Sequence, residues 1–366
     1  MKILYLVPNI SNEGGVARVL SVKINYFIEK LGFEIHILTQ NKGNFPLFYE
    51  FNSKIKLHDI SLKGNKFSFF FQYKKTLQKA VNTINPDVII VCDNGLKAFT
   101  IPFFLKSDKP IIFESHGSKF IQEFEIKNNV FSKLKLYLLL KFKEIGARKF
   151  TKVVALSDEN LKEWNVKKGI VIANPIWFET KELAKLENKK AIVLARHSYE
   201  KGLDRLLPIW QKVLKKYPDW ILEIYGKSDK NLTLQNLALS LKIDKNIRFF
   251  EPVKSIDKKY LGTSFFLMTS RSEGFGMALV EAMALGLPCV AYDCPVGPRS
   301  IIFNNENGFL VEDGNSDLFV EKINLLIENK DLRLDIGKKA KNSCEKYNLE
   351  AIMLQWKMLF EEVVKK

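Results

Sequence analysis

The sequence has few cysteines and no long apolar run. It contains no run of 18 apolar residues, so we expect no helix that crosses a membrane. The apolar N-terminal segment 1–8 is broken at Pro8, which predicts a first strand rather than a secretory signal. Four cysteines without metal-ligand spacing favour a reduced cytoplasmic protein with neither disulfides nor a metal centre: Cys92, Cys289, Cys294 and Cys344.

Two nucleotide-binding motifs are also missing. Gly14 and Gly15 lie in the first turn after a strand, but they are adjacent and do not form Gly-x-Gly-x-x-Gly, which disfavours a nicotinamide-dependent dehydrogenase. The run Gly226-Lys227-Ser228 resembles the end of a phosphate loop. Ile221 stands where that loop requires glycine, so this interpretation fails.

The chain is long enough for two hydrophobic cores, and its positive charge is uneven. It has 366 residues, of which 46% are hydrophobic, and a formal net charge of +16. Residues 1–174 hold 27 Lys and Arg against 15 Asp and Glu, whereas residues 175–366 hold 30 against 26. The N-terminal half is therefore expected to attract anionic surfaces or substrates.

Apolar segments and amphipathic segments alternate along the first half. Strands are predicted over 2–8, 34–39, 87–92, 110–114, 151–155 and 169–173, and helices near 15–31, 70–83, 131–149 and 157–164. Such alternation predicts an α/β fold with a parallel sheet covered by helices on both faces.

The segment 272–288 combines a strand end, a glycine turn and a helix. It follows the apolar run 265–268, and the helical pattern that begins after Gly276 ends at Gly286. Unpaired N–H groups at such a helix start favour an anion, and Glu273 and Glu281 lie on either side of it. The turn by itself also fits an ordinary loop with two solvated glutamates.

A second pair of charges follows another predicted strand. Arg196 comes directly after the apolar run 191–195, and Lys201 precedes a glycine and a helix. A loop of this length allows both cations to converge on one diphosphate. Either cation alone would fit a surface charge, but together with the two glutamates they favour a diphosphate-binding site.

These motifs resemble the retaining glycosyltransferases of family 4. The pattern Glu273-x7-Glu281, the pair Arg196 and Lys201, and the segment 292–299 are all similar to that family. The resemblance implies a GT-B fold, in which two Rossmann-like doubly wound domains face each other across a cleft. It implies an acceptor-binding domain at 1–174, a linker at 175–190, a nucleotide-sugar domain at 191–348, and a helix at 349–366 that crosses back to the first domain.

The same resemblance implies roles for single residues. Glu273 would contact the donor hexose, Glu281 would hold the ribose, and Arg196 and Lys201 would stabilise the leaving diphosphate. His116 would face the donor sugar and acceptor, although a histidine after a strand is often structural. The remaining donor contacts would come from Gly14, Gly15, Val253, Gly274, Phe275, Gly276, Met277, Ala278 and Leu279. No Asp-x-Asp occurs, which fits a site without metal or cofactor.

Residues 127–150 are the most basic stretch. Phe131, Leu134, Leu138, Phe142 and Ile145 recur at helical spacing, and the lysines lie mostly off their stripe. The pattern fits two structures equally: a helix on an anionic membrane, or a helix packed on its own domain with a solvated lysine face.

The sequence thus predicts transfer of a hexose or N-acetylhexosamine, favouring a UDP-linked donor, to a glycan or lipid-linked glycan. We expect no nucleic-acid partner, and a cytoplasmic location that is peripheral on the inner face of the membrane if 127–150 bind lipid. The alternatives are a non-catalytic binding protein of the same fold and, within the transferases, glycogen-like synthesis or phosphorolysis. The short chain disfavours the latter.

Overall fold

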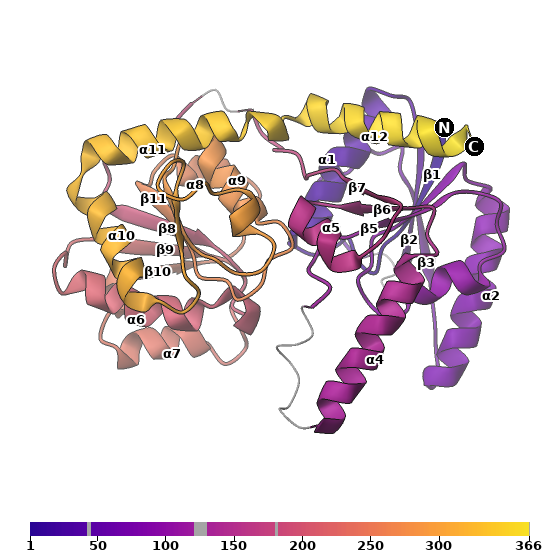
Figure 1. Ribbon diagram of the computed structural model, residues 1–366, viewed down its shortest axis with the longest axis horizontal. Helices are drawn as coiled ribbons and strands as arrows, with labels where there is room; N and C mark the ends of the chain where they lie inside the picture. The colour runs from indigo at the N-terminus through magenta and orange to yellow at the C-terminus, as the bar shows by residue number, and fades with distance from the viewer. Residues whose placement is uncertain (42–44, 121–129, 180–181, 366) are drawn as a thin grey trace. The chain divides into compact units, whose positions relative to one another are not determined.

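The computed structural model describes residues 1–41, 45–120, 130–179 and 182–365. The chain forms two compact units (Figure 1). Unit 1 comprises Met1–Trp177 and Leu349–Lys366, and unit 2 comprises Phe178–Asn348. Each unit is an α/β structure built on its own parallel sheet, as the alternating pattern predicts.

Unit 1 contains a sheet of seven parallel strands among the described residues, in the order β3-β2-β1-β4-β5-β6-β7. Its strands are β1 (Lys2–Leu6), β2 (Glu34–Gln40), β3 (Lys56–Ile60), β4 (Val88–Val91), β5 (Ile111–Glu114), β6 (Lys152–Ala155) and β7 (Gly169–Val171). Its helices are α1 (Gly15–Glu29), α2 (Lys66–Ile84), α3 (Ile101–Phe104), α4 (Val130–Ala147), α5 (Asp158–Trp164) and α12 (Leu349–Val364), with the 3₁₀ turn η1 (Ala98–Thr100).

The two faces of this sheet form two separate cores because side chains alternate along each strand. In β1, Ile3 and Tyr5 pack in a cluster with α1 and α12, whereas Leu4 and Leu6 pack in a cluster with α2. The apolar runs 88–91 and 111–113 are buried on both faces, as parallel strands between helix layers require.

One strand of unit 1, β3, is not predicted from the sequence. β3 lies at the edge of the sheet and has the sequence Lys-Leu-His-Asp-Ile, in which only Ile60 is buried. An edge strand needs little apolar surface, so its sequence carries no strong periodic signal. The other six strands of the sheet fall within the ranges predicted for them, to within one residue.

Unit 2 contains a sheet of six parallel strands in its described part, in the order β10-β9-β8-β11-β12-β13. Its strands are β8 (Lys190–Leu194), β9 (Ile221–Tyr225), β10 (Ile247–Phe250), β11 (Phe265–Met268), β12 (Cys289–Tyr292) and β13 (Phe309–Val311). Its helices are α6 (Leu203–Leu214), α7 (Thr233–Ser240), α8 (Asp257–Tyr260), α9 (Met277–Ala284), α10 (Ser316–Glu328) and α11 (Lys330–Ser343). Short 3₁₀ turns are η3 (Tyr199–Lys201), η4 (Asp244–Asn246), η5 (Pro298–Ser300) and η6 (Glu345–Tyr347).

The segment expected to be a charged linker belongs in large part to unit 2. Ala184 donates its N–H to the carbonyl of Leu285 at 3.0 Å, and the Leu186 side chain is buried. β8 begins at Lys190, within the range predicted for the linker, and residues 180–181 lie outside the described residues. The charged composition gave no sign of these anchors because part of the attachment is polar: Lys330 pairs with Glu187, and Arg333 donates to the Leu186 carbonyl.

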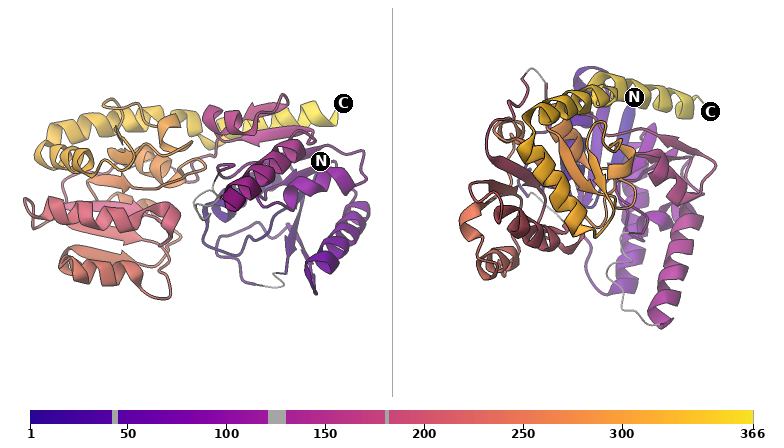
Figure 2. Two further views of the ribbon diagram at one scale, coloured as in Figure 1. Left: turned by 60° about the horizontal axis from the view of Figure 1, so that its bottom comes forward. Right: turned by 60° about the vertical axis from the view of Figure 1, so that its left-hand side comes forward.

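Helix α12 packs on unit 1, which also contains the N-terminus (Figures 1 and 2). Its apolar face buries Ile352, Met353, Trp356, Leu359, Phe360 and Val363 in the same cluster as α1 and β1. The two ends of the chain therefore build one core. Among the described helices, none is both long enough and apolar enough to cross a bilayer.

Candidate functional site

Lys201 and Glu273 meet at the carboxyl ends of two neighbouring strands in unit 2. β8 and β11 are adjacent in the sheet, and the order of strands reverses between them, because the chain proceeds from β8 to β9 on one side and returns to β11 on the other. Lys201 lies in η3 after β8, and Glu273 lies in the loop after β11. Ligands of open α/β sheets bind at this kind of crevice.

The contact between the two side chains is close. Lys201 Nζ lies 2.8 Å from Oε1 and 2.9 Å from Oε2 of Glu273. Ser270 Oγ donates a further bond of 2.6 Å to Oε1. The Lys201 side chain is 23% exposed and that of Glu273 9%. The carboxylate is therefore held in place and nearly buried, while the Lys201 side chain remains partly exposed.

A glycine allows the Glu273 loop to approach the segment after β12. Glu273 forms an isolated β-bridge with Val296, and a Cβ atom added to Gly297 would lie 2.5 Å from the Cβ of Glu273. Only glycine fits such a contact without a shift of the backbone. Gly297 lies in the family-like segment 292–299, and this contact is a physical reason for its place there.

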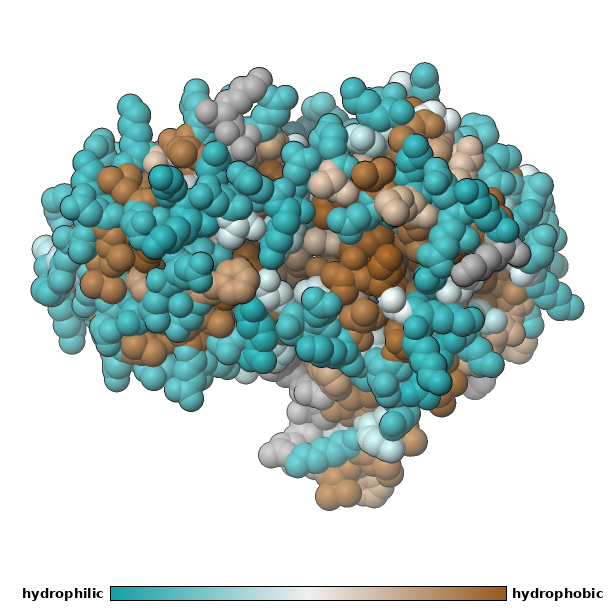
Figure 3. All heavy atoms as spheres, turned by 45° about the horizontal axis from the view of Figure 1, so that its top comes forward, coloured by the Kyte–Doolittle hydropathy of each residue, from teal (hydrophilic) through white to brown (hydrophobic). Residues whose placement is uncertain are grey.

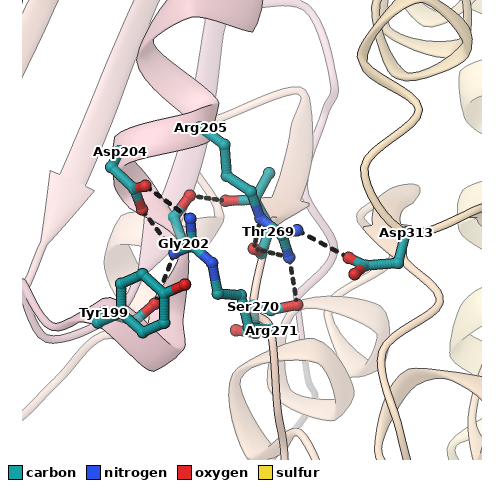
Figure 4. Close-up of polar contacts among 8 residues, drawn as sticks. All are labelled: Tyr199, Gly202, Asp204, Arg205, Thr269, Ser270, Arg271 and Asp313. Carbon is teal, nitrogen blue, oxygen red and sulfur yellow. Dashed lines mark hydrogen bonds and ion pairs between the residues drawn. The ribbon is translucent and has the colours of Figure 1, made fainter. Parts of the chain in front are cut away.

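Two arginines tie the loop of Lys201 to the loop of Glu273 (Figure 4). Arg271 donates to both carboxylate oxygens of Asp204, at 2.7 and 2.6 Å, and to the carbonyl of Tyr199 at 2.7 Å. The Arg271 guanidinium, through these hydrogen bonds, lowers the pKa of Asp204. This fork spans from the Glu273 loop to the start of α6, so it fixes one loop relative to the other.

Arg205 makes the second connection. It donates to the carbonyl of Thr269 at 2.9 and 2.8 Å, to the carbonyl of Ser270 at 2.9 Å, and binds Asp313 at 2.8 Å. Gly202 has a φ of +64°, and a Cβ there would lie 2.0 Å from the Thr269 carbonyl oxygen. The two loops therefore touch through their backbones, and the arginines satisfy the carbonyl groups at the junction.

The start of α9 offers backbone N–H groups rather than side chains. Phe275 is buried with its ring 5.4 Å from Tyr347 in an edge-on contact, and Leu279 is fully buried. Gly276 has a φ of +99° and precedes the first residue of the helix. A ligand at this turn would thus meet the backbone of 274–279.

Glu281 is buried within α9, about one turn after its start. Burial, and then the charge of Glu281, raises the pKa of Tyr260, whose hydroxyl donates to the Ala278 carbonyl at 3.2 Å. Val253 is half-buried after β10. Val253 follows the carboxyl end of β10 and Glu281 lies in α9, and both belong to the unit whose sheet positions Lys201.

Arg196 takes another partner. Its Nη2 atom lies 3.0 Å from Oε1 of Glu200, and its side chain is 61% exposed. Glu200 precedes Lys201 and accepts the N–H of Arg271 on its carbonyl at 2.8 Å. Arg196 is therefore near the same loop, but its guanidinium is bound to Glu200 rather than to Glu273.

In unit 1, the predicted residues also follow strands. Gly14 and Gly15 lie at the start of α1, after β1, and Gly14 donates its N–H to Oδ1 of Asn12 at 3.0 Å. His116 follows β5, and its Nε2 lies 3.2 Å from Oε1 of Glu114. His116 Nε2 forms no well-directed hydrogen bond, so the orientation of the imidazole ring is set by charge and packing.

Glu114, the carboxylate next to His116, pairs with a buried lysine, Lys23. Lys23 of α1 binds Glu114, and its Nζ lies 3.7 Å from the centre of the Trp356 ring in α12. Lys23 and Glu114 are both fully buried. Burial alone would raise the pKa of Glu114, but Lys23 and His116 outweigh it and lower that pKa to about 2. Sequence analysis missed this pair, because an isolated lysine in a helix carries no signal of burial.

Cys92, Glu114 and His116 have ligand atoms within 4.8 Å of one another. The three do not suit a metal ion, because Lys23 already neutralises Glu114 and burial raises the pKa of the Cys92 thiol well above its usual value. A metal would require the thiolate. The arrangement is better described as a buried ion pair next to His116.

Comparison with known proteins shows which family and which relatives this chain resembles. Residues 176–343 match the family described as "Glycosyl transferases group 1". An uncharacterized glycosyltransferase of Haemophilus influenzae is 31% identical over 97% of this chain and 99% of its own length. The amylovoran biosynthesis glycosyltransferase AmsD of Erwinia amylovora is 25% identical over 97% of this chain and 98% of its own.

Solved structures show the same fold. The lipopolysaccharide outer core galactosyltransferase WaaB superposes with a TM-score of 0.73 at 20% identity, covering 99% of this chain and 100% of its own. Anabaena HepE in complex with UDP-glucose gives 0.78 at 17% identity, covering 99% and 100%. The GT-B fold class expected from the sequence is confirmed.

Proposed function

The chain belongs to the glycosyl transferases of group 1, and from this membership we propose what it transfers. It is a glycosyltransferase of glycan or polysaccharide synthesis. We propose that it moves a hexose or N-acetylhexosamine from a nucleoside-diphosphate sugar to a glycan or lipid-linked glycan, with retention of configuration. It would do so without a metal ion.

The observation that supports the proposal most is the contact of Lys201 with Glu273 at the point where the strand order reverses. A departing diphosphate needs positive charge where its own negative charge develops. Lys201 would supply that charge by moving its ammonium group from Glu273 to the phosphates. The N–H groups at the start of α9 would add a second, fixed set of donors.

Glu273 would then contact the sugar. Its carboxylate keeps the hydrogen bond from Ser270 when Lys201 turns to the diphosphate, so it stays oriented. Arg196 would join the phosphates by leaving Glu200, a surface pair that costs little to break. Glu281 would hold the ribose from α9, and Val253 would contact the base.

We assign the acceptor to unit 1, with His116 as the group that faces the reacting sugar and Gly14 and Gly15 as backbone donors to the phosphates. A lipid-linked acceptor would place the enzyme as a peripheral protein at the inner face of the cytoplasmic membrane. Uridine is the favoured base because the HepE neighbour holds UDP-glucose.

A panel of free nucleotides and nucleotide sugars tests the donor. Thermal unfolding is recorded with UDP, GDP and ADP and with their glucose, galactose and N-acetylglucosamine conjugates. A ligand present at about 100 times its Kd stabilises the protein by about 2.7 kcal/mol. UDP compounds are expected to raise Tm and the others not. An equal response to all of them, or none to any, would contradict a specific donor site.

The rival function is a non-catalytic binding protein of the same fold. Both functions predict that a nucleotide sugar binds, so binding alone does not separate them. Release of free nucleoside diphosphate from the nucleotide sugar that stabilises the protein does separate the two functions, since a binding protein leaves its ligand intact. Slow hydrolysis without acceptor is the expected minimum activity.

A further inference from the structure

The first part of α4 has no buried residue. Over residues 130–142 every position is exposed or half-buried, although most of the side chains are apolar. The end of the same helix is firmly packed: Lys143, Gly146 and Ala147 are buried, and a Cβ added to Gly146 would lie 2.6 Å from the Phe99 carbonyl oxygen. The helix is therefore firmly packed at its C-terminal end, whereas Leu136, Leu139 and Leu140 are only half-buried and the side that bears Phe131, Leu134 and Leu138 is exposed.

Five of the exposed apolar side chains form one stripe, and Val130 and Tyr137, which are also exposed, lie to one side of it. Successive helical residues turn by about 100°, which places five of the apolar residues on the side opposite the packed Lys143 and Ala147. Phe131 is 87% exposed, Leu138 59% and Leu134 55%. The stripe consists of Phe131, Leu134, Leu138, Phe142 and Ile145. These five side chains are therefore not packed on the helix's own unit, as one of the two predicted structures would require of them.

Exposed lysines lie beside this stripe. The same helical angles place Lys135 at one edge and Lys141 at the other, with Lys133 farther round. All three are exposed. The one acidic residue of α4, Glu144, is buried and bound to Arg148. The uncovered surface thus combines apolar bulk with positive charge, and Lys127 of the predicted basic stretch lies outside the described residues.

We propose that the α4 stripe docks on an anionic lipid bilayer. The apolar side chains would enter the boundary between headgroups and acyl chains, and Lys135 and Lys141 would reach the phosphates at either edge. The excess of Lys and Arg over Asp and Glu in residues 1–174 would strengthen the attraction. A second copy of the chain fits less well, because it would bring the same lysines together.

The shape of unit 1 suits this role. The N-terminal end of α4 extends away from the sheet of its unit (Figure 1). Figure 3 shows apolar surface on the part that projects at the bottom of the view. A projecting helix that is anchored only at its end can reach a flat surface without unfolding its unit.

Co-sedimentation with vesicles tests the proposal. The full chain is mixed with vesicles of phosphatidylcholine, with or without 30 mol% phosphatidylglycerol, at low and high salt. Binding is expected to the anionic vesicles only, and to weaken as salt screens the lysines. Equal binding to both kinds of vesicle, or none to the anionic kind at low salt, would overturn the proposal.

Two variants assign the surface. Lys133→Glu/Lys135→Glu/Lys141→Glu is matched by Lys215→Glu/Lys245→Glu/Lys338→Glu, which makes the same charge change at exposed sites of unit 2. Each lost lysine is expected to weaken partitioning roughly fivefold. The α4 triple variant should thus bind at least a hundredfold less, and an equal loss in the matched variant would show unspecific attraction and refute the α4 surface.

A second pair of variants tests the contribution of the apolar side chains to membrane binding. Phe131→Ser/Leu138→Ser should abolish pelleting, whereas Leu354→Ser/Met358→Ser, at exposed positions of α12, should not. Self-association without lipid that disappears in Phe131→Ser/Leu138→Ser would assign the stripe to a second copy instead. The inference shares with the proposed function only the lipid-linked acceptor. UDP binding by these variants should be unchanged, so failure of donor binding and failure of membrane docking are distinguishable.

Discussion

Arg271 holds Asp204 by two parallel hydrogen bonds, of 2.7 and 2.6 Å, and so joins the loop of Glu273 to the helix that follows Lys201. Neither residue was expected from the sequence to matter. A fork of this kind is planar and bidentate, and lysine does not reproduce it.

Arg271→Lys should therefore misplace Lys201 relative to Glu273 without removing either. We expect kcat/KM to fall about ten- to a hundredfold, because a displaced Lys201 would lose a charge-assisted contact with the donor that is worth roughly 1.5–3 kcal/mol. Tm should change little. Steady-state kinetics with the identified donor measure the effect. Arg148→Lys, in an ion pair of unit 1, is the control, and equal kinetics in both variants would contradict a positioning role.

Lys201→Ala should weaken binding of the free nucleoside diphosphate by about ten- to a hundredfold, since it removes one charged hydrogen bond and leaves Glu273 as an uncompensated negative charge. Titration calorimetry gives the Kd. Lys212→Ala removes a lysine from an exposed pair with Asp317 in the same unit and should bind as the native protein does. Equal affinity in all three would mean that the phosphates bind elsewhere.

Glu273→Gln should lower turnover by about a hundredfold or more, a loss typical of removing one group that stabilises the transition state. The affinity for nucleotide should change modestly, because the amide keeps the size of the side chain. The exposed Glu306→Gln is the matched control. Turnover within twofold of the native rate would contradict the assigned role.

Lys23→Met should destabilise unit 1 by about 3–5 kcal/mol, since it leaves the buried carboxylate of Glu114 without its partner. Adding Glu114→Gln to it should recover most of that loss. Lys56→Met, in an exposed pair with Glu34, should cost less than about 1 kcal/mol. Denaturant unfolding measures all of these, and additive losses in the double variant would contradict the coupling.

The same pair predicts a pH dependence. The pKa of Glu114 is about 2 in the folded protein, below its ordinary value of 4.5. Its ionised form therefore contributes stability at pH values above 4.5, and this contribution is lost as the pH falls toward 2. Relative to Glu114→Gln, the native protein should lose stability more steeply across that interval. Parallel curves would contradict the lowered pKa.

EDTA should leave transfer unchanged, because Lys201 and the helix start supply the positive charge that a metal ion would otherwise provide. The assay compares initial rates with and without chelator after exhaustive dialysis. Loss of activity that Mg²⁺ or Mn²⁺ restores would contradict the proposed metal-free reaction.

The fold was largely predictable because it depends on local properties of the chain. Apolar runs such as 88–91 and 265–268 become buried parallel strands, and helices lie between them. The edge strand β3 was not predicted, because an edge strand is half polar. The anchoring of 182–189 to unit 2 was not predicted, because hydrogen bonds and an ion pair with residues far along the chain carry much of it.

The candidate site was predictable in part. Glu273 and Lys201 stand beside strand ends and glycines, which are visible in the sequence. Arg271, Arg205 and Lys23 are not, since arginine and lysine are usually solvated, and nothing local marks the few that bind carbonyls or buried carboxylates.

By itself, the sequence determined the two α/β units and the positions of the loops that end their strands, because periodicity and turn residues act over a few positions. Only the tertiary structure decided which charges meet. Lys201 and Glu273 are 72 residues apart, and strand order alone makes their loops neighbours. It also decided that the α4 stripe faces outward, because burial depends on what lies opposite a helix, and that is encoded nowhere in the helix itself.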